Sequence, residues 1–243
     1  MENRTENTAE NTAENKTENK TENTTESATE NTTEAATAIK NIIFDLGSVL
    51  IRFDRQTFLD RHAADCTPAE RTLLERETYL SAEWIMQDRG THVPAETAQI
   101  VCGRVPEKLH AAVRGLVCRW YDDILPIEGM SGLVGELKEN GYKIFLLSNA
   151  AKDFPEYWDR IPGHEYFDDW CVSAFEGFIK PQPEIYRRAL DKFGILASQS
   201  LFIDDVTANI EGALNAGMQG IVFHDDPQEL REKLHKAGVR ISV

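Results

Sequence analysis

Polar side chains that could do chemistry follow three short apolar segments of the chain. Asp45 ends the first segment, Ser148-Asn149 the second and Asp204-Asp205 the third. Carboxylates that gather at one place repel one another, so a cluster of them is stable when a cation lies in its middle. Oxygen ligands favour a hard ion, and Mg²⁺ usually binds one or two carboxylates, several waters and a substrate phosphate. The three segments therefore predict a magnesium-dependent site for phosphoryl transfer.

A carboxylate at such a site can attack phosphorus directly and form an aspartyl-phosphate. The charge on the transferring oxygens then needs an ammonium group, a hydroxyl group and backbone amides beside the metal. Lys180 is the candidate ammonium, because the sequence Lys180-Pro181-Gln182-Pro183 restricts the backbone around it. Ser148 is the candidate hydroxyl donor.

These residues can meet only if the apolar segments are strands of one sheet. Ile42-Ile43-Phe44 is a continuous apolar run, which is typical of a strand buried on both faces of a parallel sheet. Strands and helices then alternate, and functional groups gather at the carboxyl ends of the strands in such sheets. The pattern predicts further strands over residues 143–147, 170–173, 201–203 and 220–223, helices over 131–140, 183–193, 209–216 and 227–237, and a helical stretch between 149 and 170.

The whole chain divides into a tail, a core and an insert. Residues 1–38 repeat Glu, Asn and Thr in a four-residue rhythm with almost no apolar side chains, which predicts a disordered acidic tail. Residues 55–123 carry apolar side chains at three- and four-residue spacing, which predicts a small helical insert. An α/β core is predicted over residues 39–54 and 124–243, as a parallel sheet with helices on both faces.

The net charge of −15 bears on the partners of the protein. An acidic surface repels the phosphates of nucleic acids and anionic lipids, so neither nucleic acid nor a membrane is an expected partner. No signal peptide and no run of 18 apolar residues occurs, and the cysteines form no CxxC pair, which predicts a cytoplasmic protein with reduced thiols. The expected partner is a small phosphorylated metabolite, and the expected state is a monomer or weak dimer.

Four sequence motifs occur in the order that is found in one known superfamily. They are IIFDLGSVL (residues 42–50), FLLSN (145–149), KPQPEIY (180–186) and FIDDVTANI (202–210). From Ile39 onwards the chain resembles the haloacid dehalogenase superfamily of hydrolases, in particular subfamily IA, which has a helical cap after the first strand. The resemblance implies a Rossmann-like core, a cap over residues 55–123 and a Mg²⁺-dependent phosphatase.

The resemblance also implies which residues hold the metal. Asp45 is the implied nucleophile and a metal ligand, and the carbonyl oxygen of Gly47 is a second ligand. Asp205 is the implied direct ligand from the fourth motif. Asp204 acts through a metal-bound water, and Asn209 supports the same site.

The same resemblance implies how the phosphoryl group is held. Ser148 and Asn149 bind it, while Lys180 neutralises the charges of the nucleophile and the phosphate. The segment WIMQDRG, residues 84–90, lies where cap residues of the family point into the site, so Asp88 or Arg89 is a candidate to hydrogen-bond sugar hydroxyls. The segment is equally typical of a solvated helix end.

Gly47 departs from the family pattern. Most phosphatases of the family carry a second Asp two residues after the nucleophile, as general acid and base, and here that position is glycine. General acid–base help is worth about 10²–10⁴-fold, so a leaving group that needs little protonation suffers least from its loss. An anomeric sugar oxygen is such a group, and the Asp-Leu-Gly sequence is similar to a subgroup that includes α-D-glucose-1-phosphate phosphatases. The expected substrate is therefore a hexose phosphate such as glucose 1-phosphate.

Three other functions compete with this prediction. Haloacid dehalogenases also lack the second Asp and need no metal, but the Asp204-Asp205 pair would repel a substrate carboxylate. A binding module that lost catalysis would explain Gly47, although it has no need of Asp45, Lys180 and Asp205 together. A phosphotransferase or mutase needs the absent acid to pass the phosphate to a second hydroxyl.

Overall fold

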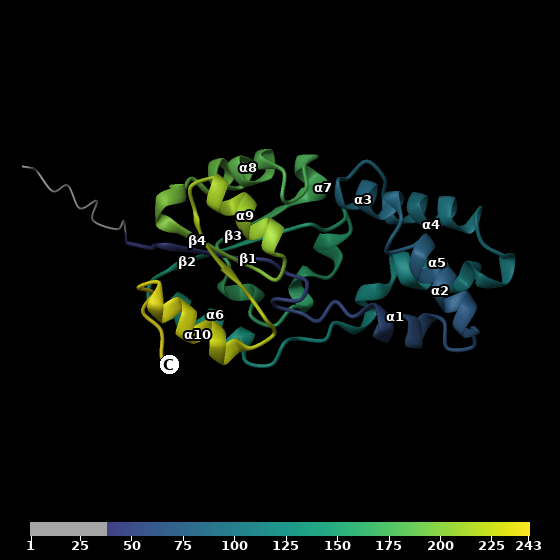
Figure 1. Ribbon diagram of the computed structural model, residues 1–243, viewed down its shortest axis with the longest axis horizontal. Coiled ribbons are helices and arrows are strands. Elements are labelled where there is room, and N and C mark those ends of the chain that lie inside the picture. Colours follow the sequence, from purple (N-terminus) through teal and green to yellow (C-terminus); the bar gives the residue numbers. More distant parts are fainter. Residues whose placement is uncertain (1–37) are drawn as a thin grey trace, which may run out of the picture. The chain divides into compact units, whose positions relative to one another are not determined.

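The computed structural model describes residues 38–243, so the predicted tail over residues 1–38 lies outside the described residues apart from Ala38. Five parallel strands form one sheet in the order β3-β2-β1-β4-β5, with β1 in the middle (Figure 1). The strands are β1 (Asn41–Phe44), β2 (Lys143–Ser148), β3 (Asp169–Val172), β4 (Ser200–Asp204) and β5 (Gln219–Val222). The predicted α/β class with a parallel sheet is confirmed.

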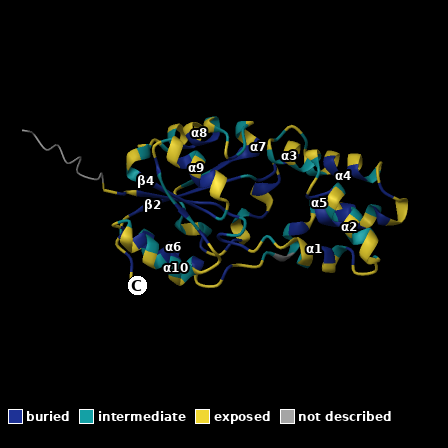
Figure 2. Ribbon diagram, in the orientation of Figure 1, coloured by how far each residue is buried: buried dark blue, intermediate teal, exposed yellow. Residues whose placement is uncertain are grey.

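Helices cover both faces of the sheet because its strands are apolar on both sides. Ile42 and Phe44 in β1 belong to a buried cluster with α6 and α10, whereas Ile43 points to the opposite face and packs with α8 and α9. Figure 2 shows the buried strands between helices whose outer sides are exposed. The helices of the core are α6 (Met130–Glu139), α7 (Ser173–Glu176), α8 (Pro183–Phe193), α9 (Thr207–Asn215) and α10 (Pro227–Lys236).

Most predicted boundaries in the core agree with the structure within one or two residues. The strands predicted over residues 143–147 and 201–203 extend to Ser148 and Asp204. The segment between residues 149 and 170 differs from its prediction, because Pro155 and Pro162 cannot donate the backbone hydrogen bonds of a continuous helix. It forms three 3₁₀ turns instead: Phe154–Glu156, Trp158–Arg160 and His164–Tyr166.

Five α-helices that lie between β1 and α6 in the sequence pack together (Figure 1). They are α1 (Arg55–His62), α2 (Pro68–Glu77), α3 (Ala82–Asp88), α4 (Pro94–Cys102) and α5 (His110–Cys118). The segments that lead into and out of this five-helix region run side by side. Arg52 N donates to the Leu125 carbonyl at 2.7 Å, and Ile127 N donates to the Leu50 carbonyl at 3.0 Å. Across residues 38–243, no helix is both long enough and apolar enough to span a membrane.

Candidate active site

The carboxyl ends of three neighbouring strands meet at one edge of the sheet. β1 lies between β2 and β4 and pairs in parallel with both. Asp45 directly follows β1, Ser148 is the last residue of β2 and Asp204 is the last residue of β4. The Asp45 N–H donates to the carbonyl of Ile203 at 2.9 Å, which fixes Asp45 beside the end of β4. The sheet order therefore brings these three predicted site residues together.

Lys180 is buried at the centre of this cluster. Its Nζ lies 2.8 Å from Asp45 Oδ1 and 2.6 Å from Asp204 Oδ2, and it donates to the carbonyl of Leu147 at 3.1 Å. Burial disfavours the ammonium, but the two carboxylates outweigh this effect, so the pKa of Lys180 is raised above its usual value. Lys180 therefore stays positively charged beside Asp45.

Asp204 is held on both of its carboxylate oxygens. Besides the contact with Lys180, it accepts hydrogen bonds from the Val206 N–H at 2.8 Å and from Asn209 Nδ2 at 3.0 and 3.1 Å. Its side chain is fully buried. Asn209 thus holds Asp204, and Asp204 in turn positions the Lys180 ammonium.

The acidic residues of the cluster fit a divalent cation. Asp45, Asp204 and Asp205 can each place one oxygen within 4.8 Å of the others. Burial raises the pKa of Asp45 to about 6 against the lowering effect of Lys180, and burial together with Asp204 raises the pKa of Asp205. Burial is the larger cause of both shifts, and the negative charge of Asp204 adds to each of them. A divalent cation among the three carboxylates would neutralise this negative charge. Because all three donors are hard oxygens, the set fits Mg²⁺.

The remaining predicted residues of the core surround this cluster. Gly47, Ser148 and Asn149 all line the pocket in front of Asp45. The Asn149 carboxamide also clamps the backbone of Lys180: the Lys180 N–H donates to Oδ1 at 2.8 Å, and Nδ2 donates to the Lys180 carbonyl at 3.2 Å. Asn149 therefore positions Lys180, a contact that the motif by itself did not predict.

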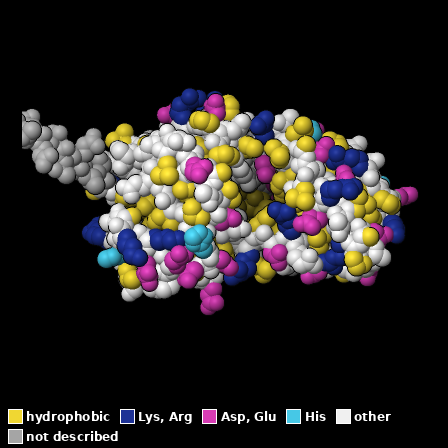
Figure 3. All heavy atoms as spheres, viewed as in Figure 1, with side chains coloured by type: hydrophobic (Ala, Val, Ile, Leu, Met, Phe, Trp, Pro, Cys, Tyr) yellow, Lys and Arg dark blue, Asp and Glu magenta, His cyan; other side chains and the backbone are white. Residues whose placement is uncertain are grey.

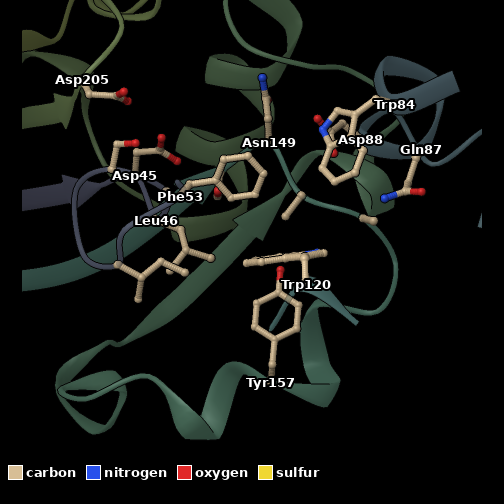
Figure 4. Close-up of a pocket in the computed structure, with 16 residues that line it drawn as sticks. Asp45, Leu46, Phe53, Trp84, Gln87, Asp88, Trp120, Asn149, Tyr157 and Asp205 are labelled. Carbon is tan, nitrogen blue, oxygen red and sulfur yellow. The ribbon is translucent and has the colours of Figure 1, made fainter. Parts of the chain in front are cut away.

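A pocket of about 220 Å³ opens in front of Asp45. Figure 4 shows the rings of Phe53, Trp84 and Trp120 around its middle, between Asp45 and the end of α3. From outside, Figure 3 shows a hollow between the core and the five-helix region, with hydrophobic side chains inside it. Phe53, Trp120 and Tyr157 also line the pocket, and the sequence does not reveal this because they are widely separated along the chain.

The end of α3 brings the five-helix region against the core. Gly90 has a φ of 80°, and a Cβ there would lie 2.0 Å from the carbonyl oxygen of Ala174, so the close approach requires glycine. Ser173 Oγ donates to the carbonyl of Asp88 at 2.5 Å across the same contact. Asp88 consequently lines the pocket, whereas Arg89 is exposed and is not one of the lining residues. The structure brings Asp88 to the predicted site and leaves Arg89 outside it.

Asp88 is expected to make the fold less stable as the pH rises. Burial and the carboxylates of Asp153 and Asp45 raise the pKa of Asp88 to about 7, against lowering by Lys180 and by a hydrogen bond from Trp84. The folded protein then binds this proton more tightly than the unfolded chain, so stability is lost as the pH rises from about 4 through about 7. We expect Asp88→Asn to raise the free energy of unfolding, and to raise it by about 1–3 kcal/mol more at pH 8 than at pH 5.

Urea denaturation of wild type and Asp88→Asn at the two pH values measures this difference. Asp191→Asn is the matched control, because Asp191 is an exposed carboxylate in α8 and should show the same effect at both pH values. An equal effect of Asp88→Asn at the two pH values would contradict the raised pKa.

Comparison with known proteins finds similarity to a family of hydrolases. The family described as haloacid dehalogenase-like hydrolase matches residues 39–217. A sesquiterpene phosphatase of Aspergillus oryzae is 26% identical over 194 residues, which cover 78% of this chain and 92% of that protein. A glyceraldehyde 3-phosphate phosphatase of Methanothermobacter thermautotrophicus is 28% identical over 123 residues, which cover 49% of this chain and 54% of that protein.

Two further similarities concern the chemistry and the fold. An (S)-2-haloacid dehalogenase of a Pseudomonas species is 25% identical over 187 residues, which cover 74% of this chain and 82% of that protein. The crystal structure of a HAD family enzyme of Bacteroides thetaiotaomicron, in complex with magnesium and inorganic phosphate, has a TM-score of 0.61 at 22% identity and covers 79% of this chain and 99% of that chain. At 22% identity, the similarity to the Bacteroides enzyme shows a shared fold. The family match spans most of the chain, and the chain belongs to the haloacid dehalogenase-like hydrolases.

Proposed function

We propose that the protein is a Mg²⁺-dependent phosphatase that hydrolyses small phosphate monoesters through an aspartyl-phosphate on Asp45. The observation that carries this proposal is the Lys180 ammonium 2.8 Å from Asp45, beside the carboxylates of Asp204 and Asp205. Together they supply a nucleophile, a fixed positive charge and donors that suit Mg²⁺. Two relatives are named phosphatases, and the Bacteroides enzyme was crystallised with magnesium and phosphate, which supports the proposal.

The proposed reaction has two steps. An oxygen of Asp45 attacks phosphorus while the bond between phosphorus and the leaving-group oxygen breaks, and that oxygen takes a proton from solvent water and departs as the alcohol. Water then attacks the phosphorus of the aspartyl-phosphate, which releases inorganic phosphate and restores the carboxylate. Lys180 stabilises negative charge in both steps from a position that Asp204 and Asn149 hold.

The metal would be held by Asp45, Asp205 and the carbonyl oxygen of Gly47, with Asp204 contributing through water. When bound, the ion supplies positive charge to the transferring phosphoryl oxygens. Ser148 is proposed to donate its hydroxyl to one of those oxygens, since it is buried at the end of β2 and lines the pocket.

The absence of a carboxyl group at Gly47 favours a substrate whose leaving group needs little protonation. A Cβ at this position would lie 3.5 Å from the Cβ of Phe53, an ordinary contact, so the backbone does not itself demand glycine. The position therefore has room for the first carbon of a side chain. A hexose phosphate such as glucose 1-phosphate is the substrate that the resemblance suggests, and of the two predicted contacts only Asp88 lines the pocket, so Asp88 is the candidate to bind a sugar hydroxyl.

A haloacid dehalogenase is the second candidate, and the Pseudomonas relative favours it. Such an enzyme would use Asp45 to displace halide from carbon and would need no cation. Asp204 and Asp205 speak against it, because uncompensated carboxylates beside the nucleophile would repel a carboxylate substrate.

The remaining proposals follow from the subfamily resemblance. Residues 55–123 are proposed to be a cap over a core formed by residues 39–54 and 124–243, which the paired segments near Leu50 and Ile127 support. We further propose that the partner is a small phosphorylated metabolite. We propose a monomer or weak dimer as the oligomeric state and the cytoplasm as the location of the protein.

Metal removal is the experiment that tests the proposed function. Phosphate release from p-nitrophenyl phosphate, glucose 1-phosphate and glyceraldehyde 3-phosphate is expected with Mg²⁺ and to fall by roughly 10²-fold or more in EDTA, because the ion supplies several kcal/mol of charge stabilisation. Adding excess Mg²⁺ should restore the rate, which controls for damage by the chelator. Halide release from 2-chloropropionate in EDTA, without phosphate release from any ester, would replace the phosphatase by the dehalogenase.

A further inference from the structure

The middle of the active-site pocket is apolar and largely aromatic. The Phe53 ring centroid lies 6.1 Å from that of Trp84 and 5.3 Å from that of Trp120. Leu46 and Ile51 also line the cavity. In Figure 4 these rings stand between Asp45 at one end and the residues of α3 at the other. A group that extends from a phosphate held at Asp45 would therefore meet apolar side chains first.

The end of the pocket away from Asp45 is polar. Gln87 and Asp88 line it (Figure 4), and Tyr157 lines the pocket beside Trp120, with ring centroids 5.2 Å apart. Both Gln87 and Tyr157 are 1% exposed. Within residues 38–243, neither the Tyr157 hydroxyl nor the Gln87 amide oxygen has a hydrogen-bond partner. Buried polar atoms are normally paired, because an unpaired one loses its hydration without compensation. Both oxygens are therefore unsatisfied among the described residues, and a ligand group that reached them would supply the missing partner.

The size of the pocket limits the organic group of the substrate. Its volume is about 220 Å³. A cavity of about 150 Å³ with apolar walls holds one benzene molecule, so this pocket has room for a phosphoryl group and about one ring.

A hexose suits these walls poorly. Its hydroxyl groups project from all around the ring, and each one costs free energy when it is buried without a partner. The middle of the pocket offers mainly the carbon surfaces of Phe53, Trp84 and Trp120, whose only hydrogen-bonding groups are the two indole N–H groups. The polar groups instead lie at the two ends, which suits a molecule that is polar at its two ends and apolar between them.

We propose that this pocket takes the phosphate monoester of a compact apolar alcohol, about one ring in size, that carries one hydrogen-bonding group at the end remote from the phosphate. The inference rests on the proposed phosphatase function, because it assigns the organic group of a substrate for that same site. The phosphoryl group lies at Asp45 and Lys180, the apolar body packs against the aromatic rings, and the remote group pairs with Tyr157 or Gln87.

Three esters of primary alcohols test the inference, since their leaving groups have similar chemistry. They are the phosphate ester of tyrosol, its analogue with a methyl group in place of the phenol hydroxyl, and glucose 6-phosphate. Both aryl esters are expected to exceed glucose 6-phosphate in kcat/KM by roughly tenfold or more, and the tyrosol ester to exceed its methyl analogue by roughly tenfold. Glucose 1-phosphate is measured alongside them to test the anomeric alternative.

Conservative variants identify the groups that pair with the remote hydroxyl. Tyr157→Phe or Gln87→Leu should reduce the ratio of kcat/KM between the tyrosol ester and its methyl analogue towards one. Tyr166→Phe is the matched control, because Tyr166 does not line the pocket, and it should leave that ratio unchanged.

The outcomes separate this inference from the phosphatase proposal. If release depends on Asp45 but a glucose phosphate is the best substrate, or if neither variant changes the ratio, the inference is overturned while the phosphatase function stands. If no ester gives phosphate release that depends on Asp45, both are overturned.

Discussion

Asp45→Asn is expected to lower the rate of phosphate release by about 10⁴-fold or more, the scale of loss when a covalent nucleophile is removed from an enzyme. The amide keeps the shape of the side chain but cannot attack phosphorus as a carboxylate does. The variant is expected to fold, because Lys180 keeps its second partner, Asp204, at 2.6 Å. Initial rates with Mg²⁺ on the best ester of the panel measure the effect.

The covalent intermediate gives a second readout for the same variant. Rapid acid quenching followed by mass spectrometry should find a phosphoryl group on the peptide that contains Asp45 in wild type and none in Asp45→Asn. Asp191→Asn, an exposed carboxylate of α8, should behave as wild type in both measurements. An Asp45→Asn protein that kept most of the wild-type rate would show that another group is the nucleophile.

Lys180→Met is expected to lower the free energy of unfolding by about 3–5 kcal/mol, because it leaves buried charges without their partner. Lys180 is 3% exposed, and it pairs with Asp45 and with the fully buried Asp204. The rate should also fall by about 10²–10³-fold, the usual effect of removing one group that stabilises charge at a reacting centre. Methionine has a similar length to lysine, so the loss of stability and of rate results from the missing charge more than from changed packing.

Urea denaturation and initial rates measure the two effects of Lys180→Met. Lys236→Met is the matched control, since the Lys236 side chain is 77% exposed and contacts Glu232 only at 3.9 Å. It should change neither quantity measurably. A Lys180→Met protein as stable as Lys236→Met would show that the buried carboxylates do not depend on this ammonium.

The core of the fold could be predicted because its signals are local. The run Ile42-Ile43-Phe44 marks a strand that is apolar on both sides, and both sides are indeed covered by helices. Pro183 and Gly194 bound α8 at the predicted residues, since proline suits a first helical turn and Gly194 adopts a φ of 64° at the end. Where prolines interrupted a weaker pattern, between residues 149 and 170, the predicted helical stretch was replaced by short turns.

The contacts of individual site residues were harder to predict. The assignment of Asn149 to the phosphoryl group stays a prediction from its motif, and the structure adds that its carboxamide clamps the backbone of Lys180. Asp88 and Arg89 are neighbours in sequence, and only Asp88 lines the pocket. Which of two adjacent side chains points inward at a helix end depends on how that end docks, and here the close approach of Gly90 to Ala174 decides it.

The sequence by itself determined the reacting groups and the strands that carry them. Asp45, Ser148 and Asp204 each sit at the end of a strand whose pattern is local, and a parallel sheet places such ends along one edge. Only the tertiary structure decided what surrounds the substrate. Phe53, Trp120 and Tyr157 come from separate segments of the chain. They share a cavity because long-range packing buries them together, and the periodicity of no single segment encodes that packing.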